Sequence, residues 1–164
     1  MSSDRQSADD ASAYAARHIR LGLWALVVYT ALGLALEGLH AFKWQGYLAV
    51  TNETRRLMWT LAHSHGTLVA LVNVAYGACL RAGAIGSRHP RIVWQLLAGA
   101  TILLPLGFFL GGVRFYSGDP GVGASLVPLG AVALLGGLVL AAVDAVDADG
   151  SPAGSGQTPR RRST

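Results

Sequence analysis

The stretch LMWTLAHSHGTLVALVNVAYGACL, residues 57–80, decides the fold of this chain. Its 24 residues contain no Asp, Glu, Lys or Arg, and a helix of this length crosses the ~30 Å hydrocarbon core of a bilayer. Two histidines, His63 and His65, nevertheless lie inside it, and Asn73 follows. Polar groups are costly in lipid, so they usually face a protein interior or a water-filled site. The stretch therefore predicts a membrane helix with a polar centre, which marks the candidate functional region.

The composition agrees with a small polytopic membrane protein. Of 164 residues, 52% are hydrophobic, only 13% are charged and 21 are glycine. The basic residues gather at the chain ends and in short segments, which indicates membrane topology and argues against a nucleic-acid partner. The single cysteine, Cys79, excludes an intrachain disulfide and is expected to be a small core residue.

Three further apolar runs complete an all-α, four-helix transmembrane bundle. The expected helices cover about 21–40, 52–81, 92–112 and 122–143, within a membrane domain of residues 21–145. The run after Arg20 is longer than a signal-peptide core and no cleavage site follows, so it is expected to remain as the first helix. Residues 1–20 form a polar N-terminal segment, disordered in its first half and then an interfacial helix. The tail, residues 146–164, is predicted to be disordered by its composition.

The distribution of Lys and Arg predicts the orientation. The N-terminal segment, the second loop and the tail carry nine, whereas the first and third loops carry only Lys43, Arg55, Arg56 and Arg114. With four helices, the positive-inside rule places both termini in the cytoplasm. We expect a multi-pass protein of the bacterial inner membrane, with the lipid bilayer as its first partner.

This topology places a His/Glu cluster in the outer leaflet. Glu37 and His40 lie on a polar stripe of the first helix, near its outer end, and His63 and His65 lie in the outer half of the second helix. Because His63 and His65 are two residues apart, their side chains point about 200° apart and cannot hold one metal together. Each is expected to face a different neighbouring helix.

Small and polar residues mark the faces on which helices pack closely. Helices in membranes associate through small residues and interhelical hydrogen bonds, and Gly-rich faces also permit a homodimer or a larger membrane complex. The expected packing positions are Gly33 on the first helix and Gly66, Asn73 and Gly77 on the second.

The cluster is compatible with three functions. A haem b or a transition metal would take His40 and one of His63 or His65 as ligands, because neutral imidazole suits both groups. An isomerase or redox enzyme would use His63 as acid or base, with Glu37 tuning it. Alternatively, the cluster has only a structural or partner-binding role in a membrane subunit.

The segment Ala62-His63-Ser64-His65-Gly66-Thr67-Leu68, followed by Asn73, resembles a family pattern. It is similar to the Ala-His-x-x-Gly…Asn motif of small four-helix bacterial membrane proteins of the hydroxylaminobenzene-mutase-like type, and the helix also resembles fragments of haem-copper oxidase subunits. The resemblance carries over His63 and Asn73 and leaves His65 outside the motif. It implies a cofactor-independent isomerase that rearranges a hydroxylamine. We place the cofactor-binding function first and the isomerase second.

Overall fold

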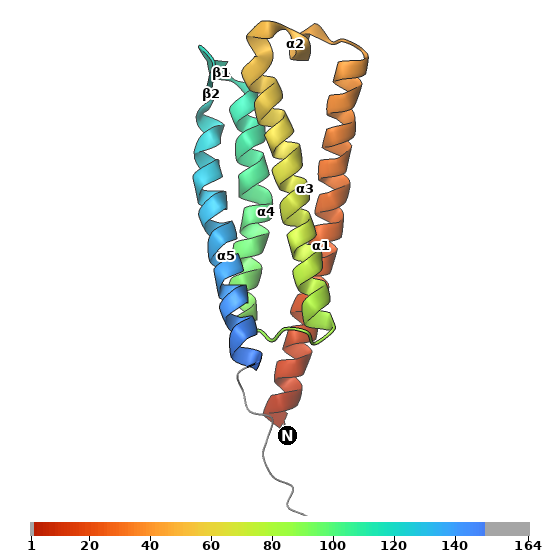
Figure 1. Ribbon diagram of the computed structural model, residues 1–164, viewed down its shortest axis with the longest axis vertical. Coiled ribbons are helices and arrows are strands. Elements are labelled where there is room, and N and C mark those ends of the chain that lie inside the picture. Colours follow the sequence, from red (N-terminus) through yellow and green to blue (C-terminus); the bar gives the residue numbers. More distant parts are fainter. Residues whose placement is uncertain (1, 150–164) are drawn as a thin grey trace, which may run out of the picture.

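The computed structural model describes residues 2–149 and is mostly helical (Figure 1). Four long helices run side by side within this part of the chain. They are α1 (Ser2–Ala41), α3 (Glu53–Arg81), α4 (Pro90–Val113) and α5 (Leu126–Asp149). The all-α class predicted from the apolar runs is therefore confirmed, and the second and third helices begin and end within two residues of their predicted bounds.

Short elements join the long helices at the end opposite the N-terminus (Figure 1). The α1–α3 connection contains α2 (Gln45–Leu48) and the 3₁₀ turn η1 (Val50–Asn52). The predicted turn after α4 is an antiparallel hairpin of β1 (Phe115–Tyr116) and β2 (Asp119–Pro120), followed by the 3₁₀ turn η2 (Val122–Ser125). Ser117 and Gly118 form the hairpin turn, both with positive φ, and glycine adopts such a conformation without steric cost.

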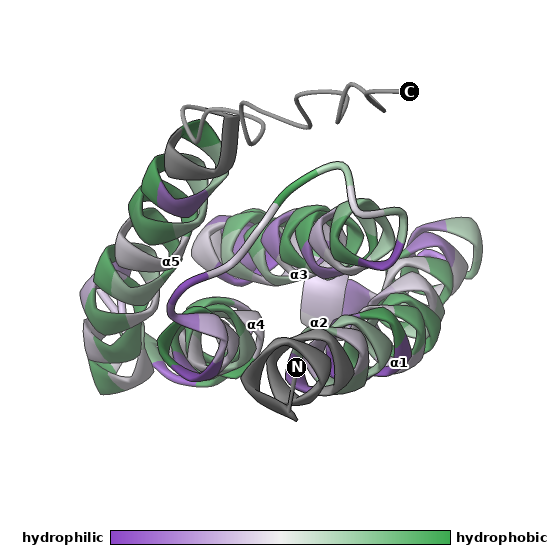
Figure 2. Cartoon of the chain, turned by 90° about the horizontal axis from the view of Figure 1, so that it is seen from below, coloured by the Kyte–Doolittle hydropathy of each residue, from purple (hydrophilic) through white to green (hydrophobic). Residues whose placement is uncertain are grey.

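The helices are arranged with α3 and α4 in the middle (Figure 2). Helix α1 packs against α3, and α5 packs against α4. At the end nearest the N-terminus, an apolar core joins all four long helices. Its buried members are Ala15, Tyr76, Leu80, Val93, Leu97 and Ala141.

The N-terminal segment differs from its prediction. Helix α1 is continuous from Ser2, so no break separates a polar segment from a first membrane helix near residue 21. The segment contains no Gly or Pro before Gly22, and Ala and Arg in it favour helix. Packing adds a tertiary reason, because Ala15 and His18 are fully buried.

The last helix is also longer than predicted. Helix α5 continues to Asp149, so residues 146–149, predicted to belong to a disordered tail, are helical. Burial of Asp144 near this end ties the helix to the α3–α4 connection. The remainder of the predicted tail, residues 150–164, lies outside the described residues.

Within residues 2–149, three helical segments are long and apolar enough to cross a membrane. They are Asp10–Ala41, Pro90–Val113 and Val122–Val146, and such helices are typical of a membrane protein. Helix α3 is not among the three, although it contains the stretch expected to be the central membrane helix. Its two histidines and Asn73 lower its hydropathy.

Candidate functional site

A buried polar network links α1, α3 and α4. His18 and Asn73 have no exposed surface, and Thr101 is 2% exposed. The Nδ1–H of His18 donates to Oδ1 of Asn73 at 2.8 Å. The Nδ2 group of Asn73 donates to Oγ1 of Thr101 at 2.9 Å and to the carbonyl of Val69 at 3.0 Å. Asn73 thus uses both ends of its amide to join three helices.

The sequence did not single out His18, which it placed in the polar N-terminal segment. The imidazole packs edge-on against the rings of Tyr76 and Trp94, with centroid separations of 4.9 and 5.1 Å. Its Nε2 is buried and has no hydrogen-bond partner among the described residues. The available signal was the series Ala15, His18, Gly22 and Ala25, whose spacing of three and four residues marks the buried face of a helix.

Pro105 creates a second polar contact between α1 and α4. A proline has no N–H, so the carbonyl of Thr101, four residues earlier, loses its helical partner. The hydroxyl of Tyr29 donates to that carbonyl at 2.5 Å. The Tyr29 ring lies against Gly66, where an added Cβ would come within 2.5 Å of it. One tyrosine therefore satisfies the carbonyl freed by Pro105 and fills the space left by a glycine.

His63 and His65 face different helices, as their spacing predicts. The Nδ1–H of His63 donates to the carbonyl of Tyr29 at 2.7 Å, and the imidazole lies so close to Gly33 that a Cβ there would collide with it. His65 donates to the carbonyl of Leu61 in its own helix at 3.0 Å, and its ring contacts Phe108 of α4. His63 therefore belongs to the α1–α3 contact and His65 to the α3–α4 contact.

The expected cluster of Glu37, His40, His63 and His65 does not assemble. Glu37 is exposed and makes no hydrogen bond or ion pair with another described residue. His40 donates to the carbonyl of Leu36 in its own helix at 3.2 Å and packs against Tyr47. Over the described part of the chain, no three His, Cys, Asp or Glu side chains gather as metal ligands would.

Gly77, the remaining predicted packing residue, lies at a helix contact. Gly77 of α3 approaches α1 so closely that an added Cβ would lie 2.8 Å from the carbonyl oxygen of Ala15.

Cys79, expected in the core, is exposed. It faces outward because Tyr76, Gly77 and Leu80 occupy the buried side of that turn.

His40 lines a pocket of about 280 Å³ at the α2 end of the molecule. Its other lining residues are Tyr47, Glu53, Arg56, Leu57 and Thr60. Arg56 also donates to the carbonyl of Leu48 at 2.9 Å, which fixes α2 against α3. An imidazole and a carboxylate therefore line one pocket. The carboxylate beside His40 is that of Glu53, whereas the sequence predicted Glu37.

Arg55 holds the same end of the molecule together. Its Nε and Nη2 donate to the carbonyls of Gly112 and Val113 at the end of α4, and its Nη1 donates to Gly46 of α2 at 2.9 Å. A cation at a helix C-terminus also opposes the negative end of the helix dipole. The ring of Trp59 stacks between Tyr47 and Phe109 beside it.

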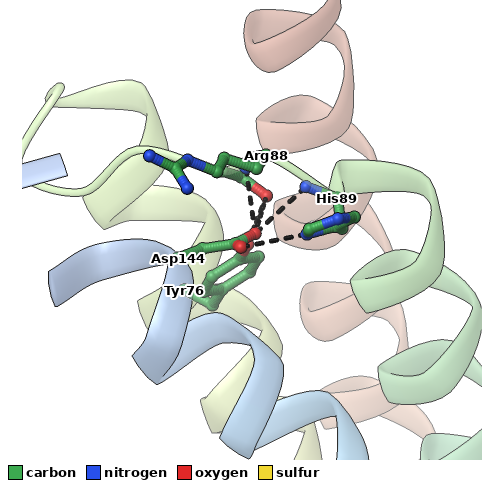
Figure 3. Close-up of polar contacts among 5 residues, drawn as sticks. Tyr76, Arg88, His89 and Asp144 are labelled. Carbon is green, nitrogen blue, oxygen red and sulfur yellow. Dashed lines mark hydrogen bonds and ion pairs between the residues drawn. The ribbon is translucent and has the colours of Figure 1, made fainter. Parts of the chain in front are cut away.

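Asp144 performs the corresponding role at the opposite end (Figure 3). The residue is 2% exposed, and its Oδ2 accepts from the backbone N–H groups of Arg88 and His89 at 2.9 and 3.1 Å. Oδ1 lies 3.1 Å from Nδ1 of His89, and the hydroxyl of Ser87 donates to Oδ2. Because α4 begins at Pro90, an acid from α5 caps the N-terminus of α4.

No family model, curated protein or solved structure matches this chain.

Proposed function

We propose that this chain is a multi-pass protein of the bacterial inner membrane, with four spanning helices and both termini in the cytoplasm. Arg17 and Arg20 lie at the same end as the α3–α4 connection, which adds Arg81, Arg88 and Arg91. At the other end, Arg55 and Arg56 bind carbonyl oxygens of the protein. The N-terminal end carries more Lys and Arg than the other end, where Lys43 and Arg114 are the remaining basic residues, and this excess supports a cytoplasmic location for the N-terminal end.

Helix α3 spans the membrane in this proposal because the neighbouring helices shield its polar groups. Asn73 is fully buried, and His63 contacts α1. The outward faces of α1 and α5 expose apolar side chains suited to lipid, such as Leu23 at 51% and Val132 at 71% exposure.

Within this membrane fold, we propose a non-catalytic subunit whose histidines and Asn73 hold the helices together. The observation that carries this is the His18–Asn73–Thr101 network, in which three helices exchange hydrogen bonds in an apolar interior. Small residues and interhelical hydrogen bonds are the usual means of helix association in lipid. Gly33 and Gly66 supply the small residues at the same contacts.

The donor set does not fit a haem or metal held by His40, His63 and His65. His63 and His65 face α1 and α4 respectively. His63 lies against Gly33, and His40 is seven residues farther along α1, or ~10 Å at 1.5 Å per residue. Ligands of one metal must converge on it at ~2 Å, and these do not.

The His40 pocket supports a second candidate, an acid–base enzyme of the kind that the mutase resemblance implies. His40 and Glu53 line it together, and such a pair is suited to proton transfer. In this candidate His40 takes the role that the sequence motif gave to His63.

The experiment compares His63→Ala with His40→Ala in purified protein. For the non-catalytic subunit, His63→Ala lowers the unfolding temperature in detergent, since it removes a contact between α1 and α3. His40→Ala lowers the temperature less, because its hydrogen bond stays within α1 and only its ring contact with Tyr47 of α2 is lost. Rearrangement of hydroxylaminobenzene that is lost in His40→Ala would overturn the non-catalytic proposal in favour of the enzyme.

A further inference from the structure

We propose that the face between α1 and α4 binds one anionic phospholipid of the cytoplasmic leaflet. Its phosphate would lie at Arg17 and Arg20, and one acyl chain would occupy the apolar cavity beside Pro105. The inference rests on the proposed membrane location and adds a specific lipid ligand to it.

A pocket of about 350 Å³ forms the headgroup site. It is lined by Arg17, Arg20, Leu21, Trp24 and Trp94. Guanidinium groups bind phosphate oxygens through paired hydrogen bonds, and two of them in one pocket suit a single phosphate.

Both guanidinium groups are available for such a ligand. Arg17 lies over the ring of Tyr14 at 4.9 Å, and Arg20 uses only its Nε, which donates to the carbonyl of Ala16 at 3.4 Å. Neither forms an ion pair with a carboxylate of the described residues. Their charge is therefore not neutralised within this part of the protein.

The two tryptophans place this pocket at the depth of lipid headgroups. Indole rings concentrate at the boundary between hydrocarbon and water, and Trp24 is 71% exposed on the surface of α1. Basic pockets between membrane helices on the cytoplasmic side attract anionic headgroups. The positive charge of the pocket and its expected depth at the membrane boundary therefore both favour an anionic headgroup as the ligand.

A separate apolar cavity of about 330 Å³ supplies the acyl-chain site. It opens to the surface, where Val28 and Ile102 are 60% and 55% exposed. Its lining residues are Val28, Tyr29 and Leu32 of α1, Ala62 of α3, and Ile102, Pro105, Leu106 and Phe109 of α4. Its walls are almost entirely apolar, so a hydrocarbon chain is a suitable occupant.

The two pockets are in register along the same helix faces. On α1, Val28 follows Trp24 by one turn, or ~6 Å, and the residues that line the two pockets fall within one half of the helix circumference, ~180° at 100° per residue. On α4, Ile102 follows Trp94 by ~12 Å. This offset fits within one leaflet, whose hydrocarbon is ~15 Å deep. A free phosphate would use only the first pocket, whereas a phospholipid uses both.

The test is native mass spectrometry of the full chain in detergent, titrated with phosphatidylglycerol, phosphatidylcholine or inorganic phosphate. We expect one phosphatidylglycerol to bind, with weaker binding of the other two. The double variant Arg17→Gln/Arg20→Gln should bind it about thirty-fold more weakly, from ~1 kcal/mol for each basic residue. The matched control, Arg81→Gln/Arg91→Gln, removes two exposed charges at the same end of the molecule. Its affinity for phosphatidylglycerol should stay within about three-fold of that of the unaltered protein.

The acyl-chain site has its own variant. Ile102→Phe adds bulk to the acyl-chain site without altering charge. If it excludes two methylene groups of the acyl chain from the site, phosphatidylglycerol should bind about tenfold more weakly. Unchanged unfolding temperatures show that the variants are folded.

Three results would overturn the proposal: equal loss in the two double variants, equal binding of phosphatidylcholine, or equal binding of inorganic phosphate. Each leaves the membrane topology intact, because topology is measured separately by thiol labelling in cells.

Discussion

Replacing Asn73 by Ala removes the residue that joins three helices. The change deletes two interhelical hydrogen bonds, one from His18 and one to Thr101, with lengths of 2.8 and 2.9 Å. It also leaves the Nδ1–H of a fully buried imidazole without an acceptor. The loss should therefore exceed that of an ordinary surface substitution.

The magnitude follows from these contacts. Interhelical hydrogen bonds in a membrane protein are worth ~0.6 kcal/mol on average and up to ~1.7 kcal/mol, so two contribute about 1–3 kcal/mol. A buried donor left without a partner costs a similar ~1–3 kcal/mol. Both figures describe the same broken hydrogen bonds, so they are not added together. We therefore expect Asn73→Ala to lower the free energy of unfolding by about 1–3 kcal/mol.

The assay is reversible unfolding in mixed micelles, followed by circular dichroism. Ser64→Ala is the matched control, because Ser64 is exposed on the same helix and its hydroxyl donates only to the carbonyl of Leu61. Asn73→Leu separates the loss of hydrogen bonds from the cavity that alanine leaves. A double-mutant cycle with His18→Ala should give a coupling energy of ~0.6–1.7 kcal/mol.

Two outcomes would refute this reasoning. The first is an Asn73→Ala variant whose free energy of unfolding lies within ~0.5 kcal/mol of that of Ser64→Ala, because surface substitutions usually change stability by no more than this. The second is a coupling energy near zero, which would mean that His18 and Asn73 do not exchange a hydrogen bond.

Three further predictions use the same unfolding assay. Gly33→Ala should destabilise by about 1–3 kcal/mol, because its Cβ collides with an imidazole, whereas Gly38→Ala, with open space around it, should be neutral or stabilising; equal effects would contradict the contact. Tyr29→Phe should cost ~0.5–1.5 kcal/mol, and it should cost less in a Pro105→Ala background, where the restored N–H satisfies the same carbonyl; an unchanged cost would contradict this role. Asp144→Ala should cost ~1–2 kcal/mol by uncapping α4, and a loss within ~0.3 kcal/mol of zero would show that the cap is dispensable.

The sequence predicted the helices well because their bounds are local. Helix α3 begins at Glu53 and ends at Arg81, against predicted bounds of 52–81, since charged residues delimit its apolar run. The opposite directions of His63 and His65 also followed from helix geometry alone.

The candidate site was predicted less well because it depends on how helices are rotated against one another. Glu37 was expected in the His/Glu cluster, but the residue that is buried there is Leu36, and a shift of one residue along a helix turns the side chain by 100°. His18 and Asp144 were missed because their partners lie 55 residues or more away in the chain, on another helix for His18 and in the α3–α4 connection for Asp144. Periodicity within one helix carries no information on such pairs.

The central claim is that α3 crosses the membrane despite its polar residues, and thiol labelling in intact cells tests it most directly. In a Cys79→Ser background, Thr51→Cys and Ala84→Cys place single exposed thiols at the two ends of α3. We predict that a membrane-impermeant reagent labels Thr51→Cys in intact cells and labels Ala84→Cys only after permeabilisation. The same labelling pattern for both positions would contradict the account, because the two ends of α3 would then lie on one side of the membrane.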